Sequence, residues 1–402
     1  MTGASTITTN ADATISAGIA AGGLFKNGTG VLTLSGVNTI AGMVIADGTI
    51  QLGSATAFTS GSTLTLGLPD ANTVTLDLNT FDATVGAISS NNAGGTKTIT
   101  NTGATLSTFT INNAAATNLG GLFTGTNLKL SQTGAALLTL TAANSYGGGT
   151  SITGTGGVLI TDLGALGGGA AAIGAGSQLD INTAGGTLAN ALTLNGGTLR
   201  QSAANQVTAT GLITVNSAST INVAVANPGK LFISGGFSGV GDLVRSGNGI
   251  LQITVASPTY SGNWTINGGQ TEAQIAGALG TGGVTVNTGG ELVASNALIG
   301  NNVTIGSAGA LLSFDNGGAG DFRGTLNAAQ NFTVILKDFY QNVARNGTIS
   351  GVISGAGNMS VTAPAPTTTT VSSLLLTGNN AAYTGTITVG TNAQVRDRKS
   401  VV

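Results

Sequence analysis

The most chemically suggestive residues of the chain are two aspartates five positions apart, Asp77 and Asp82. Placed on neighbouring strands, they would form the carboxylate pair with which glycoside hydrolases supply a general acid and a base or nucleophile. The simpler interpretation is that Asp77 is the outward member of an alternating strand and Asp82 lies in a turn. Most other acidic residues stand alone in the sequence: Asp12, Asp47, Asp70, Asp162, Asp180, Asp242, Glu272 and Glu291. The acids therefore predict no catalytic residues.

Composition removes several other chemistries. The 402 residues include no cysteine and no histidine, which excludes thiolate nucleophiles, cysteine zinc sites, Ser-His-Asp triads and histidine metal sites. The glycine-rich segment 164–176 is not followed by Lys-Ser/Thr, so it does not resemble a phosphate-binding loop. The repetitive calcium-binding Gly-Gly-x-Gly-x-Asp nonapeptide is absent. The sequence predicts no metal site, no cofactor-binding residues and no cofactor.

Charge and hydropathy exclude two classes of partner. The chain has 12 Lys and Arg and 14 Asp and Glu, for a net charge of −2. The basic residues are scattered from Lys26 to Lys399, so no run neutralises several phosphates and no nucleic-acid partner is expected. The stretch 163–177, which is built of small, uncharged residues and is rich in glycine, is shorter than the ~20 residues of a membrane span. We therefore expect no transmembrane segment, and the N-terminus shows no signal peptide.

The elements that would position any site are short β-strands. Val74-Thr75-Leu76-Asp77-Leu78 places three apolar side chains on one face and two polar ones on the other, and this period-two alternation recurs along the chain. Asn-Gly and Asp-Gly steps between such segments mark tight turns. Since no window shows a helical stripe, the chain is predicted to be all-β.

An internal repeat organises these strands. Four copies lie near residues 24–53, 127–160, 242–270 and 372–395. Each has an alternating apolar strand, a small polar turn, then an aromatic residue or Ile followed two positions later by Gly. The key pairs are Ile40/Gly42, Tyr146/Gly148, Tyr260/Gly262 and Tyr383/Gly385. The uneven spacing of the copies favours stacked coils over a propeller.

The first copy closely resembles a known family. Its Lys26-Asn27-Gly28-Thr29-Gly30 segment, followed by Val31-Leu32-Thr33-Leu34 and a closing strand at 48–52, is similar to the autotransporter-associated β-strand repeat, also called the passenger-associated transport repeat. Ile40 stands where the family has Tyr, and Ser257 stands where the second copy has Asn144. The resemblance implies the passenger region of a bacterial surface protein, folded as a right-handed parallel β-helix (β-solenoid).

Physical considerations suit this fold. Coils of roughly 22 residues would give about 18 coils, with strands about 4.8 Å apart. The rival is an antiparallel sandwich, because Asn-Gly steps are also hairpin signals. We predict that residues 1–395 form the β-helix passenger-like region. Residues 396–402 are predicted to be a non-native tail, because four of their seven side chains are charged.

The predicted function follows from the resemblance. It is a non-catalytic structural or adhesive passenger segment of an autotransporter-like surface protein, acting as a rigid stalk or an export-folding module. The alternatives are a carbohydrate-active β-helix enzyme (polysaccharide lyase or hydrolase) and the stalk of an enzyme outside this chain. The implied partners are cell-surface glycans or proteins and the protein's own outer-membrane barrel. The implied location is the cell surface or the extracellular space. No barrel strands are visible, so an internal fragment of an exported protein is expected.

One segment, 314–345, differs from the rest. It concentrates five aromatic and six charged residues in 32 positions. One interpretation is a projecting loop with Phe339 and Tyr340 exposed for binding. The other is a bulky coil interior.

Overall fold

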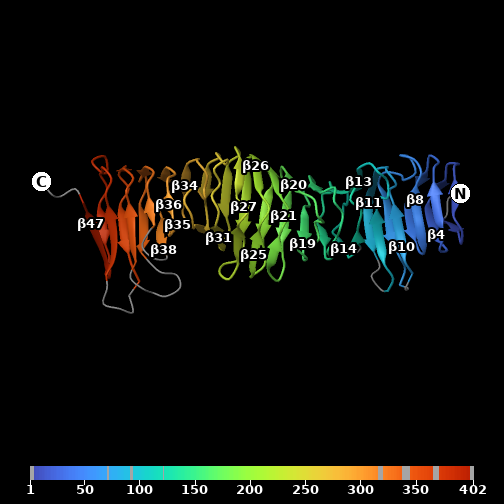
Figure 1. Ribbon diagram of the computed structural model, residues 1–402, viewed down its shortest axis with the longest axis horizontal. Coiled ribbons are helices and arrows are strands. Elements are labelled where there is room, and N and C mark those ends of the chain that lie inside the picture. Colours follow the sequence, from blue (N-terminus) through green and yellow to red (C-terminus); the bar gives the residue numbers. More distant parts are fainter. Residues whose placement is uncertain are drawn as a thin grey trace. The chain divides into compact units, whose positions relative to one another are not determined.

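The computed structural model describes residues 4–69, 72–90, 94–120, 122–315, 320–336, 345–364 and 371–398. Within these ranges all regular secondary-structure elements are β-strands, and all strand pairings are parallel. The predicted all-β parallel β-helix (β-solenoid) is confirmed (Figure 1). No helix long and apolar enough to span a membrane occurs in the described ranges. The chain divides into two compact units, Met1–Thr183 with Asn190–Thr193 and Ala184–Ala189 with Leu194–Val402.

Unit 1 contains three main sheets. The first consists of β1 (Ala4–Thr8), β4 (Gly23–Asn27), β7 (Gly42–Ile45), β9 (Ser62–Leu66), β11 (Ala83–Ser90), β13 (Ser107–Ile111), β16 (Leu128–Gln132), β18 (Thr150–Ile152) and β20 (Ala171–Gly174). The second consists of β2 (Ala13–Ile15), β5 (Val31–Leu34), β8 (Gly48–Leu52), β10 (Val74–Asp77), β12 (Lys97–Thr100) and β15 (Leu122–Phe123). The third consists of β14 (Thr117–Leu119), β17 (Leu138–Leu140), β19 (Val158–Ile160) and β21 (Gln178–Ile181), and β3 (Ala20–Ala21) pairs with β6 (Thr39–Ile40).

Unit 2 continues the same design, and β23 (Leu192–Asn195) has residues in both units. Its longest sheet consists of β22 (Gly186–Leu188), β25 (Gln206–Ala209), β28 (Lys230–Ile233), β31 (Ile250–Ile253), β33 (Gly269–Ala273), β35 (Gly290–Ser295), β38 (Ala310–Asp315), β41 (Phe332–Leu336), β44 (Met359–Thr362) and β46 (Ile387–Val389). A second consists of β24 (Thr198–Gln201), β27 (Ser219–Val223), β30 (Leu243–Ser246), β32 (Trp264–Ile266), β34 (Val284–Val286), β37 (Val303–Ile305), β40 (Leu326–Asn327) and β43 (Ile353–Ser354). The others are β26 (Ile213–Ser217) with β29 (Phe237–Gly239), and β36 (Leu298–Ile299), β39 (Asp321–Phe322), β42 (Asn346–Ile349), β45 (Ser372–Leu376) and β47 (Ala393–Asp397).

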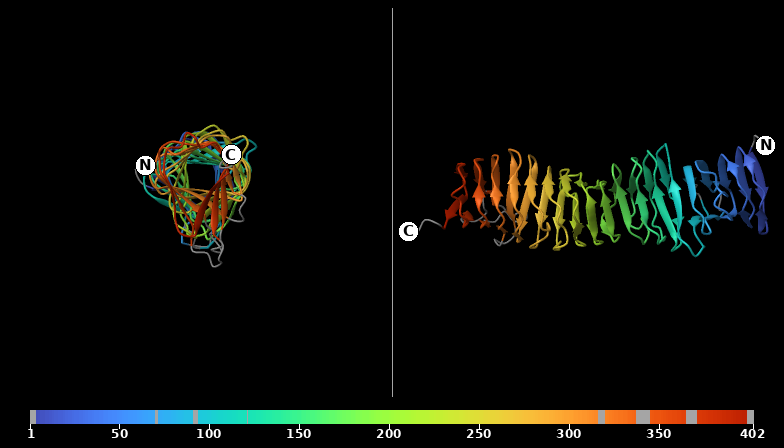
Figure 2. Two further views of the ribbon diagram at one scale, coloured as in Figure 1. Left: turned by 90° about the vertical axis from the view of Figure 1, so that its left-hand side faces the viewer. Right: turned by 90° about the horizontal axis from the view of Figure 1, so that it is seen from above.

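Columns of apolar side chains fill the interior of each unit. Leu32, Ile50, Leu76 and Ile99 are register partners on β5, β8, β10 and β12, and all four are buried. Side chains alternate between the faces of a strand, so every second residue joins such a column. Burying each one stabilises the fold by about 1.5–3 kcal/mol relative to leaving it exposed. The views in Figure 2 show the coils of each unit following one another around this interior.

The Tyr-x-Gly step of the repeat connects adjacent coils. The hydroxyl of Tyr260 donates to the Gly241 carbonyl at 3.0 Å. A Cβ atom on Gly262 would lie 2.0 Å from that same carbonyl oxygen, so only glycine fits there. The fourth copy repeats the arrangement with Tyr383, Gly385 and Gly357. The motif therefore marks the place where the glycine lies close to the backbone of the neighbouring coil, beside the hydrogen bond of the tyrosine hydroxyl.

A polar residue two or three positions before the tyrosine also connects coils. Asn144 Oδ1 accepts from the Phe123 amide at 2.8 Å, and Asn144 Nδ2 donates to the Ala165 carbonyl at 2.6 Å. Ser257, at the corresponding place in the third copy, accepts from the Phe237 amide at 3.0 Å. The serine thus keeps the bond to the preceding coil, which explains why the substitution leaves the strand pattern intact.

The segment 314–345 is only partly described. Phe314, Phe322 and Phe332 are buried, and the rings of Phe314 and Phe322 meet edge to face with centroids 5.2 Å apart. These three rings belong to the coil interior. Phe339 and Tyr340 lie outside the described residues.

The C-terminal segment begins as part of a strand. Arg396 and Asp397 are the last residues of β47, where they are register partners of Leu375 and Leu376. The assignment of 396–402 as a non-native tail stays a prediction.

Candidate functional site

The structure gives Asp77 and Asp82 separate structural roles. Asp77 is buried on β10, where it accepts hydrogen bonds from Gln51 Nε2 at 2.9 Å and from the amide and hydroxyl of Thr102 at 3.0 and 2.7 Å. Asp82 is exposed, outside any strand, and accepts from the Thr108 amide at 2.7 Å. Each carboxylate therefore holds a neighbouring coil in place, and the arrangement does not present them as an acid–base pair.

The basic residues of the repeat are buried turn caps. Lys26 Nζ donates to the carbonyls of Asn27, Gly28 and Asp47 at 3.2, 2.6 and 3.0 Å. Arg245, at the corresponding place in the third copy, is fully buried and donates to the carbonyls of Ser246 and Gly249. Burial lowers the pKa of both groups, that of Arg245 to about 10. These cations satisfy turn carbonyls that would otherwise be buried without a donor.

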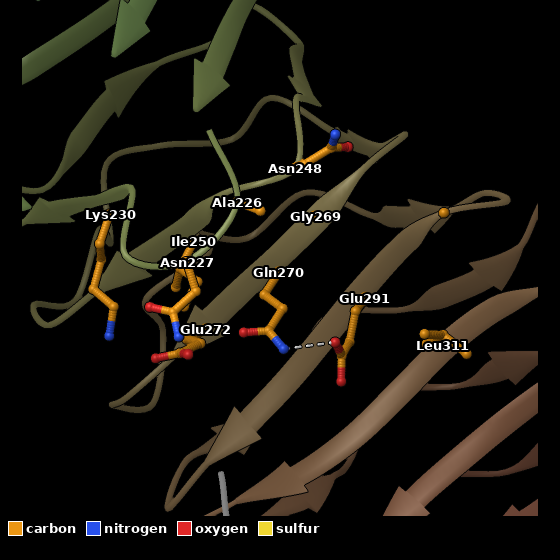
Figure 3. Close-up of a pocket in the computed structure, with 11 residues that line it drawn as sticks. Ala226, Asn227, Lys230, Asn248, Ile250, Gly269, Gln270, Glu272, Glu291 and Leu311 are labelled. Atoms are coloured by element: carbon orange, nitrogen blue, oxygen red, sulfur yellow. Dashed lines mark hydrogen bonds between the residues drawn. The ribbon is translucent and has the colours of Figure 1, made fainter. Parts of the chain in front are cut away.

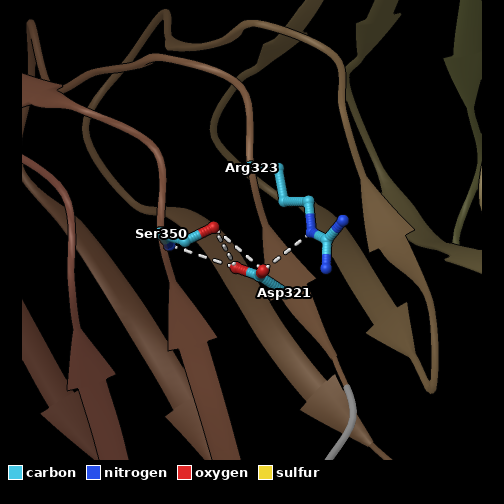
Figure 4. A network of polar contacts seen from close by, with 3 residues as sticks. All are labelled: Asp321, Arg323 and Ser350. Atoms are coloured by element: carbon cyan, nitrogen blue, oxygen red, sulfur yellow. Dashed lines mark hydrogen bonds and ion pairs between the residues drawn. The ribbon is translucent and has the colours of Figure 1, made fainter.

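A charged pair of the 314–345 segment lies beside hydrogen bonds that connect two coils. Arg323 Nε lies 3.0 Å from Asp321 Oδ2, and the Ser350 amide and hydroxyl donate to the same carboxylate at 3.1 and 2.9 Å (Figure 4). The Arg323 side chain is 56 % exposed, so the ion pair itself contributes little stability. The Ser350 bonds connect two successive coils.

A cavity of about 530 Å³ lies in unit 2 against one face of β28, β31, β33, β35 and β38. The alternate residues of these strands, such as Leu231, Leu251 and Leu292, face the solenoid interior, so the cavity is on the outward face. Among the described residues its walls are Ala226, Asn227, Lys230, Asn248, Ile250, Gly269, Gln270, Glu272, Gly289, Glu291 and Leu311.

Strand register brings the polar residues of this cavity together. Lys230, Ile250, Gln270, Glu291 and Leu311 are successive Cα partners across the five strands. Glu272 lies two positions after Gln270 and therefore on the same face. The acids that look isolated in the sequence are thus gathered by a coil length of 20 or 21 residues in this region. Once the coil length of this region is known, that spacing brings the acids together.

Glu291 is fixed by its neighbours. Gln270 Nε2 donates to Glu291 Oε2 at 2.9 Å, as Figure 3 shows, and the Ser313 hydroxyl donates to Glu291 Oε1. Glu291 is therefore positioned on the cavity wall.

Glu272 is the unusual member of the cluster. It is 2 % exposed, and within the described part of the chain it has no hydrogen-bond partner. Burial raises the pKa of Glu272 to about 7, against the opposing effect of Lys230 and with further raising effects of Asp315 and Glu291. The carboxyl therefore exists in both protonation states near neutral pH.

Lys230 completes the charged wall. Its Nζ lies 5.2 Å from the centre of the Phe232 ring, a cation–π distance. In Figure 3 the side chains of Lys230, Glu272, Gln270 and Glu291 extend to one side of the sheet. The described residues contain no group of three or more side chains placed to hold a metal ion. The wall presents both hydrogen-bond donors and acceptors to the cavity.

Comparisons with known proteins agree with the repeat architecture. The family model for the passenger-associated-transport-repeat matches residues 24–52, 130–160 and 243–271, which overlap the first three predicted copies. The fourth copy stays a prediction. The chain is also 30 % identical over 160 residues to the BmaC autotransporter adhesin of Brucella suis biovar 1 (strain 1330). That match covers 39 % of the chain and 4 % of the adhesin. No solved structure matches the chain significantly. The chain therefore contains three passenger-associated transport repeats within its parallel coils and is similar over 160 residues to part of an autotransporter adhesin.

Proposed function

We propose that the chain is a non-catalytic adhesive segment of an exported bacterial surface protein, with surface glycans or proteins as its ligands. The observation that carries this proposal is that the characteristic residues of the repeat form structural contacts. Lys26, Arg245, Tyr260 and Gly262 all form contacts between or within turns. The repeats therefore build a scaffold, and its outward faces are left for recognition. The similarity to a protein named an autotransporter adhesin supports the same role.

The non-catalytic part of the proposal has its own support. Asp77 and Asp82 are each engaged by backbone amides of neighbouring coils. A role as a rigid stalk or export-folding module is compatible with adhesion. A stack of coils separates the regions at its two ends and also exposes its outward faces for binding. We include in the proposal that the longer protein carries an outer-membrane barrel and displays this chain outside the cell.

Adhesion of the purified chain tests this function. Polystyrene beads coated with the 402-residue chain are expected to bind cultured epithelial cells several-fold more than beads coated with albumin. Soluble chain should compete for this binding, because both forms present the same faces. Equal binding by the two kinds of bead would overturn the adhesive role.

The enzyme alternative has a separate test. Because the cavity of unit 2 contains Glu272 and Glu291, the chain is incubated with polygalacturonate and other common polysaccharides. We expect no release of reducing or unsaturated ends. Release that disappears in Glu272→Gln or Asp77→Asn would establish a carbohydrate-active enzyme.

A further inference from the structure

We propose that the cavity around Glu272 is a binding site for an uncharged polyhydroxyl ligand, of the size of one or two sugar rings, whose hydroxyls bond to the Glu272 carboxyl. The inference names the ligand class of the proposed adhesive function and rests on that function for its biological role. Its test measures the cavity alone.

The cavity has the dimensions of a ligand site. Its volume of about 530 Å³ falls within the range of about 300–1,000 Å³ usual for small-molecule sites. It is bounded by a sheet, which is rigid, and on one side by Ala226 and Asn227 of the connection between β27 and β28. Positions held by a sheet orient side chains more precisely than positions on loops.

Glu272 accepts no hydrogen bond from the described residues, which leaves its carboxyl available to a ligand in the cavity. A buried carboxyl without a hydrogen-bond partner destabilises the fold. Lys230 attracts the ionised carboxyl, whereas the register partners Val293 and Gln252 are an aliphatic residue and a neutral amide. Groups that are retained at a cost to stability are characteristic of functional sites.

A second unsatisfied group lies next to it. Gln252 is 4 % exposed, and its Oε1 atom is buried without a hydrogen-bond partner among the described residues. Gln252 and Glu272 are Cα partners on β31 and β33. A buried acceptor without a partner among the described residues therefore lies beside Glu272 on the same face.

The charges around the cavity select an uncharged ligand. A cationic ligand would meet Lys230, and an anionic ligand would meet Glu272 and Glu291 on the same wall. A hydroxyl group both donates and accepts, so it can bond to a carboxylate and to an amide or ammonium donor. Asn227, Asn248 and Lys230 line the cavity as such donors, and Ile250 and Leu311 provide apolar surface for the C–H groups of a ring.

The test measures binding of simple sugars to the full chain at pH 7. Galactose, mannose, lactose and N-acetylglucosamine are the uncharged probes, with glucosamine as the cationic and glucuronate as the anionic analogue. Saturation-transfer NMR and calorimetry should detect at least one uncharged probe. We expect each charged analogue to bind at least fivefold more weakly than the best uncharged probe.

Three variants locate the site. Glu272→Gln keeps the size of the side chain and removes the carboxylate, so binding should weaken at least tenfold. Ala226→Trp, at an exposed position on the cavity wall, should block entry while leaving the sheet unchanged. Asp242→Asn, an exposed acid that is not part of the wall, is the matched control and should bind as the unmodified chain does.

The outcomes separate the two proposals. Absence of binding by every uncharged probe, or binding that survives both Glu272→Gln and Ala226→Trp, overturns the cavity assignment. Tighter binding of a charged analogue overturns the uncharged-ligand assignment. Sugar binding without bead adhesion would instead overturn only the adhesive function, and adhesion without sugar binding would overturn only the cavity site.

Discussion

Trp264→Ala is expected to destabilise unit 2 by about 4 kcal/mol, within the range for removing a fully buried tryptophan. Trp264 is 0 % exposed on β32, with its ring centre 5.3 Å from that of Phe237 and 6.0 Å from that of Tyr260. Its indole N–H donates to the Leu279 carbonyl at 3.1 Å. Alanine would leave a cavity between these rings and remove the donor of a buried carbonyl.

Urea denaturation followed by far-UV circular dichroism measures this loss. Because Trp264 is the single tryptophan of the chain, its fluorescence follows unfolding of its own surroundings in the unmodified protein. Trp264→Phe is the control: it keeps an aromatic ring and loses the N–H bond, so the expected loss is about 1–2 kcal/mol. A loss below 1 kcal/mol for the alanine variant would contradict the packing described for this cluster.

Glu272→Gln is expected to stabilise the protein by about 3 kcal/mol above pH 7, with the gain shrinking as the pH falls towards 4.5. The folded-state pKa of Glu272 is raised from 4.5 to about 7, chiefly by burial. The folded protein therefore holds a proton that the unfolded chain releases above about pH 4.5, so this group makes the native state less stable as the pH rises to 7. Glutamine carries no charge at any pH and removes this dependence.

The difference between variant and unmodified protein isolates the contribution of Glu272. Urea denaturation at pH 5, 6, 7 and 8 should give a difference in the free energy of unfolding that is smallest at pH 5 and reaches its full value at pH 8. Asp242→Asn, an exposed carboxylate, should show no rise of this kind. A difference in the free energy of unfolding that is the same at every pH would mean that folding does not raise the pKa of Glu272.

The scaffold could be predicted because its signals are local. Alternation such as Val74 to Leu78 specifies strands with one buried face. The Tyr-x-Gly step has the same role in the third and fourth copies, since the tyrosine hydroxyl and the glycine both lie against one neighbouring carbonyl. Resemblance to a repeat family then favoured stacked parallel coils over an antiparallel sandwich.

The cavity could not be predicted because register is not local. Cα partners are 20 residues apart at Ile250 and Gln270, 26 at Thr49 and Thr75, and 23 at Asp77 and Thr100. Without the coil lengths, Lys230, Glu272 and Glu291 look unrelated along the chain.

The buried cations have a similar explanation. Composition suggests that Lys26 and Arg245 are solvated, as most lysines and arginines are. Their burial follows from turn geometry, which directs several carbonyl oxygens to one point. A sequence shows the glycines of such a turn but not the direction of its carbonyls.

Surface labelling of the organism that encodes the chain tests the central claim most directly. Antibodies raised against the purified chain are applied to intact and to permeabilised cells, with a cytoplasmic protein as the control for leakage. An exported adhesive passenger predicts labelling of intact cells at the level seen after permeabilisation, and loss of that label after brief protease treatment of intact cells. Labelling that appears only in permeabilised cells would contradict the account.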